Sequence, residues 1–140
     1  MKLAGDFFYL IESYPASDGF VATLSLNPVH PIFQAHFPGQ PITPGVVIIM
    51  MAVELLQIAQ DLGISQTLEN AAVLQLCGVR NAKFVRALCP TDTTTVRFSF
   101  SRIVRLPQCI QFQVSVTGRN EPEGEYVLYS KLSLQCSKGL

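Results

Sequence analysis

A proline-rich stretch followed at once by a very apolar helix constrains this chain more than any other feature. Residues 27–44 contain five prolines, so regular structure is not expected there. From Val46 to Asp61 the residues are apolar on nearly every side, with Glu54, Gln57 and Gln60 as the main interruptions. A helix of that kind has to be buried, so the rest of the domain must wrap around it.

The residues that flank this helix predict where it begins and ends. Thr43 is expected to be the N-cap, and Pro44 suits the first helical position because its missing N–H would be unpaired there anyway. Gly63 is expected to stop the helix. The irregular stretch before it is long for a compact domain, and such stretches are usually functional.

Alternating apolar and polar residues predict strands on both sides of the helix. We expect strands at residues 7–12, 20–26, 73–79, 82–86, 94–104, 110–117 and 126–136. The turns RLPQ and NEPEGE separate the last three and indicate an antiparallel meander. No repeat or linker divides the chain, so residues 1–140 are expected to form one α+β domain, in which a curved antiparallel sheet of about five to seven strands wraps the helix.

The chain is more hydrophobic than one such domain needs to fill its own core. Hydrophobic residues make up 49% of the chain and the mean hydropathy is +0.32. We expect a second copy to cover the outer face of the sheet and part of the helix, giving a homodimer or a larger assembly such as a trimer of dimers. The longest apolar run, Val46 to Val53, is far short of the ~20 residues that a membrane span needs. The N-terminus resembles no signal peptide, so a cytoplasmic location is expected.

Charge excludes some partners and favours one kind. The formal net charge is zero, which argues against nucleic-acid binding. Basic residues nevertheless gather between residues 80 and 105, opposed only by Asp92. They are either solvated strand faces or a docking surface for an acidic partner. The docking candidates are Arg80, Lys83, Arg86 and Arg102.

The four cysteines do not indicate a metal or redox site. No two of them have the C-x-x-C spacing, and without a secretory signal we expect them to be reduced core or interface residues. There is no glycine-rich phosphate loop and no cluster with metal-ligand spacing, so the sequence implies no metal and no cofactor.

Two segments of the chain resemble a known family. The stretch HPIFQAHFPGQPITPGVVIIMMAVELLQIA is similar to the helix-opening motif of the FabZ/FabA-type 3-hydroxyacyl-acyl carrier protein dehydratases, F-x-G-H-F-P-G-x-P-x-x-P-G-V, which Phe33 to Val46 match apart from Ala35. NAKFVRALCPTD, residues 81–92, resembles their A-K-F-x-R-x-V-x-P-G-D segment, with Thr91 where glycine is usual. The resemblance implies a hotdog fold and acyl carrier protein as the partner that delivers the acyl chain.

The same resemblance implies roles for residues at the start of the helix. His36 would be the base that removes the α-proton of a 3-hydroxyacyl thioester, with Phe37 beside it among the substrate-binding residues. The amides of Gly45 and Val46 would hold the thioester carbonyl, a role that suits unpaired N–H groups at the positive end of a helix. The acyl tail would lie in a tunnel between subunits, lined by helix residues Val47, Met50 and Met51. His30 matches no functional position of the family and is expected to be a loop residue.

One departure from the family affects the chemistry. The family has a Glu or Asp six residues after the helix-opening proline, to protonate the leaving hydroxyl, and that position here is Met50. Glu54 follows one helical turn later. Three interpretations stay open: Glu54 replaces the acid, a second dehydratase subunit supplies it in a heterodimer, or the chain binds acyl thioesters without dehydrating them, as a thioesterase-like or scaffolding relative.

Overall fold

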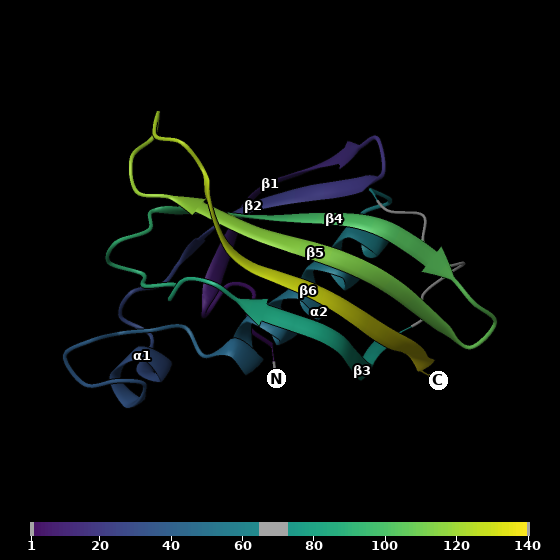
Figure 1. Ribbon diagram of the computed structural model, residues 1–140, viewed down its shortest axis with the longest axis horizontal. Coiled ribbons are helices and arrows are strands. Elements are labelled where there is room, and N and C mark those ends of the chain that lie inside the picture. Colours follow the sequence, from purple (N-terminus) through teal and green to yellow (C-terminus); the bar gives the residue numbers. More distant parts are fainter. Residues whose placement is uncertain (1, 65–72, 140) are drawn as a thin grey trace.

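A curved antiparallel sheet packs against one long helix in the computed structural model, which describes residues 2–64 and 73–139 (Figure 1). The strands are β1 (Phe8–Ala16), β2 (Gly19–Leu26), β3 (Val73–Phe84), β4 (Thr95–Arg105), β5 (Cys109–Arg119) and β6 (Val127–Gly139). The helices are the short α1 (Pro31–Ala35) and the long α2 (Gly45–Asp61). The strand order is β1-β2-β4-β5-β6-β3, so β1 and β3 form the two edges of the six-stranded sheet. This α+β arrangement confirms the predicted fold class.

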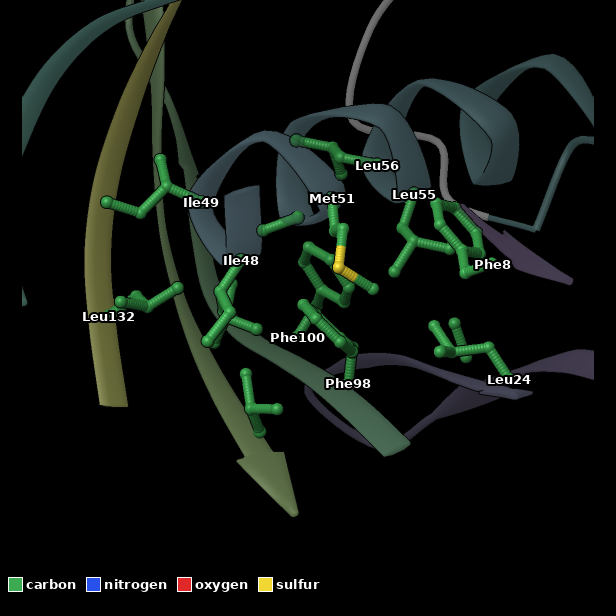
Figure 2. Packing of buried hydrophobic residues seen from close by; sticks show 14 of the residues in the cluster. Phe8, Leu24, Ile48, Ile49, Met51, Leu55, Leu56, Phe98, Phe100 and Leu132 are labelled. Atoms are coloured by element: carbon green, nitrogen blue, oxygen red, sulfur yellow. The ribbon is translucent and has the colours of Figure 1, made fainter. Parts of the chain in front are cut away.

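The core lies between the sheet and one side of α2. Met51 and Leu55 point from the helix toward Phe98, Phe100 and Leu24 on the strands (Figure 2), and Met51 and Phe98 are completely buried. Alternation explains this face of the sheet, because the residues between these apolar positions on β4 are polar and point outward. For α2, the sequence thus predicted correctly both the C-terminal end at Asp61 and an apolar side that is buried.

Three local expectations were wrong, each for a physical reason. Residues 73–84 form one strand instead of two, because register shifts between Leu76 and Gly78 and between Val79 and Asn81 absorb the breaks in the alternation. β1 continues to Ala16 through Pro15, which an edge strand tolerates. Residues 31–35 form a helical turn within the stretch expected to be irregular.

The helix cap also differs from the expectation. Pro44 is the N-cap and makes no side-chain capping bond. Thr43 is instead buried, and its backbone amide donates to the carbonyl of Leu88 at 2.8 Å. The segment after β3 therefore holds the start of α2 in place, which a side-chain cap would otherwise do.

Several exposed apolar residues lie along one seam of the molecule, where α2 meets β3, while the outward-facing residues of β4 and β5 are mostly polar. On β3, Leu76, Val79 and Phe84 are 40–46% exposed. The residues paired with them on β6 lie on the helix side of the sheet, as the buried Leu134 opposite Val79 shows. On α2, Val46 is 64% exposed and Met50 is half-buried. We call this seam between α2 and β3 the α2–β3 trough. No helix in the described part of the chain is long and apolar enough to cross a membrane.

Candidate active site

A cavity of about 390 Å³ opens where the histidine loop meets the first turn of α2. We call it the His36 cavity. It is lined by His36, Ile42, Thr43, Pro44, Gly45, Ile48, Phe84, Val85, Arg86, Ala87 and Leu88. Two of the predicted site residues, the candidate base and the glycine of the helix start, thus share one cavity.

The backbone around His36 fixes the position of its ring. His36 is the C-cap of α1, and its amide donates to the carbonyl of Ile32 at 3.0 Å. Its own carbonyl accepts from the amide of Ile42 at 3.0 Å. The ring stacks on the half-exposed Phe37 with centroids 4.1 Å apart, and Nδ1 lies 3.4 Å from the carbonyl oxygen of Ile42. With Nδ1–H directed at that carbonyl, Nε2 is the nitrogen left to take up a proton.

The start of α2 offers unpaired N–H groups beside this ring. The amides of Val47 and Ile48 donate to the carbonyl of Pro44 at 3.0 and 3.1 Å. Within the described residues, the amides of Gly45 and Val46 have no hydrogen-bond partner. Such groups can stabilise negative charge on an oxygen. Of the two, Gly45 lines the His36 cavity and Val46 does not, so the cavity holds a ring nitrogen that can accept a proton and an N–H that can donate to an oxygen.

Phe84 forms a wall of the cavity that sequence reasoning did not single out. A Cβ built on Gly45 would lie 2.9 Å from Cζ of the Phe84 ring. Only glycine lets the ring approach the helix start this closely. The signal was present in the sequence, because the phenylalanine belongs to the NAKFVR segment and the glycine to the PGV segment.

Glu54 lies away from the His36 cavity of its own chain. Its Oε1 accepts from the amides of Leu3 and Ala4 at 2.9 and 2.8 Å, and its Oε2 accepts from Leu3 at 2.8 Å. It lines a second cavity of about 450 Å³, the Glu54 cavity, at the other end of the trough. That cavity is formed by Met50, Val53, Glu54, Gln57, Val73, Leu74, Gln75 and Leu76.

The residues expected to line an acyl tunnel separate into two groups. Met50 lines the Glu54 cavity. Val47 and Met51 are 6% and 0% exposed and belong to the core, so neither lines a described cavity. The reason is helical geometry: residues 47 and 51 share the side of α2 that faces the sheet, whereas 46, 50 and 53 lie on the side toward the trough.

The basic docking candidates do not form one cluster. Arg86 is exposed, lines the His36 cavity and lies 5.8 Å from the centroid of the Tyr129 ring. Arg80 and Arg102 line a separate cavity of about 180 Å³. Lys83 is exposed on β3 opposite Lys131. Only Arg86 is therefore next to the candidate site.

The cysteines are all free, and two have altered acidity. Burial, together with the neighbouring Cys77, raises the pKa of Cys136 to about 12. Burial and the nearby Asp92 carboxylate raise the pKa of Cys89. Since the thiolate is the nucleophile, neither is suited to nucleophilic catalysis. The described part of the chain also contains no group of three or more His, Cys, Asp or Glu side chains that could hold a metal ion.

Two structural roles of charged or polar residues were missed. His30 is the N-cap of α1, and its Nδ1 accepts from the amide of Ile32 at 3.1 Å. The His-Pro pair could have indicated this, because proline favours the first helical position. The bonds between Glu54 and residues 3 and 4 join segments about fifty positions apart and have no local sequence signal.

Comparison of the sequence with known proteins agrees with this geometry. Curated relatives include the 3-hydroxyacyl-acyl-carrier-protein dehydratase FabZ of Xylella fastidiosa strain M23, 28% identical over 98 residues that cover 70% of this chain and 61% of the relative. FabZ of Xanthomonas oryzae pv. oryzae strain PXO99A is 28% identical over 95 residues, covering 68% and 60%. The chain thus spans about three fifths of the length of these relatives.

Solved structures with the same fold include a dehydratase and a thioesterase. The dehydratase heterocomplex ApeI:P from Xenorhabdus doucetiae matches with a TM-score of 0.60 and 20% identity, over 92% of this chain and 96% of that chain. A thioesterase from Haemophilus influenzae matches with a TM-score of 0.56 and 16% identity, over 93% and 76%. These likenesses show the hotdog fold.

The family is decided by a match to the sequence itself. The model of the ApeI-like family, described as ApeI dehydratase, matches residues 13–124. These residues include the histidine loop, the whole of α2 and most of the sheet. The chain belongs to the ApeI-like dehydratase family.

Proposed function

We propose that this chain is a subunit of an enzyme that removes water from a 3-hydroxyacyl thioester carried by acyl carrier protein. The observation that carries the proposal is the cavity that the His36 ring shares with Gly45, whose unpaired amide begins α2. The membership of the family and the FabZ relatives support the same reaction. Four free cysteines are in keeping with a reducing compartment such as the cytoplasm.

In the proposed reaction, each half of the site has one task. Nε2 of His36 takes the α-proton, and the electrons of that C–H bond move toward the thioester carbonyl. The carbonyl oxygen, now carrying negative charge, accepts hydrogen bonds from the amides of Gly45 and Val46. The new double bond forms as the C3–O bond breaks, and the hydroxyl leaves as water once it has received a proton.

The donor of that last proton is the part of the site that this chain does not hold beside His36. Met50 cannot donate a proton, and Glu54 lies at the Glu54 cavity with both oxygens accepting from backbone amides. The acid therefore comes from a second subunit, either Glu54 of a facing copy or an acidic residue of a different chain. The Xenorhabdus doucetiae structure is named as a heterocomplex, which supports the second source.

A second copy or a related subunit is proposed to cover the α2–β3 trough. β3 is an edge strand with exposed Leu76, Val79 and Phe84, and an open apolar edge is a pairing surface that natural proteins normally cover. This placement differs from the expected one on the outer face of the sheet, which is polar.

Val79→Asp should weaken such an assembly. Sedimentation of the purified protein and this variant tests it, and a wild-type chain that remains monomeric at high concentration, alone and with a dehydratase subunit, would contradict the assembly.

The acyl carrier protein is proposed to approach over Arg86. This side chain is exposed at the His36 cavity, where its charge can meet an acidic surface or the phosphate of the carrier arm. Arg80, Lys83 and Arg102 lie further along the sheet and would act by longer-range attraction.

A non-catalytic, acyl-binding subunit is the second candidate function. Met50 at the usual acid position and the engagement of Glu54 favour it. It would share the cavity and the carrier-protein surface with the enzyme and differ only in turnover.

One set of incubations separates these functions. The purified chain is mixed with a 3-hydroxyacyl carrier-protein thioester, alone and together with a FabZ subunit whose own histidine has been replaced, and the enoyl product is measured. We expect product in at least one mixture, and its loss in His36→Ala but not in Gln34→Ala, an exposed residue on the same short helix. Thioester binding without product in every mixture would establish the acyl-binding role, and product that survives His36→Ala would refute the mechanism.

A further inference from the structure

The segment from Lys2 to Phe8 touches both helices that build the candidate site. At one point, the amides of Leu3 and Ala4 donate to the carboxylate of Glu54 on α2. At the other, the Asp6 carboxylate lies 3.0 Å from Nε2 of His30, the N-cap of α1. In Figure 1 the N-terminal end of the chain lies beside α2, between α1 and β3.

The contact with α2 is largely shielded from solvent and made by strong hydrogen bonds. The side chain of Leu3 is 1% exposed, and Glu54 is only partly exposed. The carboxylate receives three N–H contacts of 2.8–2.9 Å from two successive amides. Bonds of this charge-assisted kind are among the stronger ones in proteins. The segment itself is compact, because the amides of Asp6, Phe7 and Phe8 all donate to the carbonyl of Leu3.

The contact with α1 is directional. Nδ1 of His30 accepts from the amide of Ile32, so in the neutral ring the proton is on Nε2, which donates to Asp6. The completely buried Phe7 packs its ring 5.2 Å from that of His30 and 5.0 Å from that of Phe33. The loop before α1 is tied in too, since the amide of Asn27 donates to the carbonyl of Phe7 at 2.8 Å.

The two contacts bear on the distance between the base and the oxyanion site. His30 caps the beginning of α1 and His36 caps its end, so the orientation of this short helix sets where the His36 ring lies. Glu54 belongs to the helix whose first amides are the oxyanion site. A segment attached to both helices therefore limits how far one can move relative to the other.

We infer that residues 2–8 act as a clasp that holds the His36 loop in register with the start of α2, and that Glu54 and His30 are its anchoring, positioning residues. In this inference the carboxylate of Glu54 serves the clasp and is not the proton donor. The inference rests on the proposed function for its effect on turnover, but the clasp itself can be measured without any substrate.

Two substitutions of Glu54 distinguish an anchor from an acid. Glu54→Gln keeps a side-chain oxygen that accepts from the amides but cannot donate the acid's proton, whereas Glu54→Leu keeps the bulk and removes the acceptor. The first measurement is hydrogen exchange at the amides of Leu3 and Ala4. We expect exchange at least about tenfold faster in Glu54→Leu, because the opened amides lose their partners, and exchange close to wild type in Glu54→Gln.

The second measurement reports on His36 directly. The chain contains two histidines, so selective labelling gives one ring signal from His30 and one from His36 in an NMR spectrum. We expect the His36 signal to shift or broaden in Glu54→Leu and to stay in place in Glu54→Gln. At the other anchor, His30→Ala loses both the cap of α1 and the contact with Asp6, and should perturb the His36 signal most. His30→Asn, whose side-chain oxygen can still cap α1 but does not reach Asp6, should perturb it less but measurably.

Activity completes the test in whichever mixture forms product. We expect kcat to fall in Glu54→Leu and His30→Ala with a smaller change in KM, to be largely kept in Glu54→Gln, and to fall to an intermediate value in His30→Asn. A Glu54→Gln protein with normal exchange and no turnover would overturn the inference and make Glu54 the acid. Unchanged exchange and an unchanged His36 signal in Glu54→Leu would overturn it as well. If no mixture forms product, the proposed function fails, while exchange and NMR still decide on the clasp.

Discussion

Replacing Gly45 with alanine tests the candidate oxyanion site with the smallest possible change. The new methyl group would lie 2.9 Å from Cζ of Phe84, and 3.1 and 3.3 Å from the two Cε atoms. Carbon atoms in good contact are about 3.5–4.0 Å apart. The ring therefore has to move away by at least about 0.6 Å. It can do so, because it ends a flexible side chain that is 46% exposed.

The same geometry predicts a small effect on stability and a large one on turnover. Alanine gains up to about 1 kcal/mol over glycine in a helix, and the displaced ring offsets part of this. The free energy of unfolding should thus change by less than about 1 kcal/mol. The methyl group and the moved ring, however, change the shape of the His36 cavity, which both Gly45 and Phe84 line. Losing one oxyanion donor costs about 10²–10³ in kcat, so we expect kcat to fall at least tenfold.

A double-mutant cycle identifies the cause. If the moved ring is responsible, Gly45→Ala should be less harmful in a Phe84→Ala background than in the wild type. Product formation gives the rates, and denaturant unfolding gives the stabilities. Gly124→Ala, in the turn between β5 and β6 and outside the lining of the His36 cavity, serves as the control. A folded Gly45→Ala protein with wild-type kcat would refute the placement of the reacting carbonyl, and a Gly45→Ala protein that fails to fold would refute the account of the ring.

Three further predictions concern packing and thiol chemistry. Gly19→Ala should lower the free energy of unfolding by at least about 2 kcal/mol, because the added Cβ would clash with the carbonyl oxygen of Phe100 on β4 and the backbone has φ +156°. Denaturant unfolding at wild-type stability would contradict this. Phe98→Ala should lower the free energy of unfolding by about 3–5 kcal/mol, because the ring is completely buried. Val29→Ala, at a side chain that is 76% exposed, should change that free energy little. Equal denaturant midpoints for the two variants would contradict the placement of Phe98 in the core. Cys136, with its pKa raised to about 12, should stay unalkylated at pH 8 while exposed Cys77 reacts, because only the thiolate attacks; mass spectrometry that finds both modified at the same rate would disprove it.

Periodicity explains why the sequence predicted so much of this fold. The largely apolar segment from Val46 to Asp61 predicted a helix with a buried side, and the alternation in residues 94–104 and 110–117 is seen in β4 and β5. β3 was harder, because two bulges break its alternation and make it look like two short strands. The five-residue α1 was missed because so short a helix has no hydrophobic period of its own.

Part of the candidate site was also predictable from the sequence, and part was not. That His36 and Gly45 lie together was predictable because one continuous motif carries both, and the structure brings them to one cavity. The partners of Glu54 were not predictable, since backbone amides at positions 3 and 4 offer hydrogen bonds whatever their side chains are. Whether that carboxylate faces another subunit's histidine depends on an assembly that one sequence does not describe.

The open edge of β3 has a consequence for how the protein must be handled and kept in a cell. Its outer row of N–H and C=O groups pairs with no strand in the described part of the chain, and apolar side chains flank that row. A newly made chain is therefore prone to aggregation until a partner covers this strand. Its melting temperature should rise with protein concentration or with added partner. In the proposed assembly with a different subunit, balanced synthesis of both chains would protect this one from aggregation.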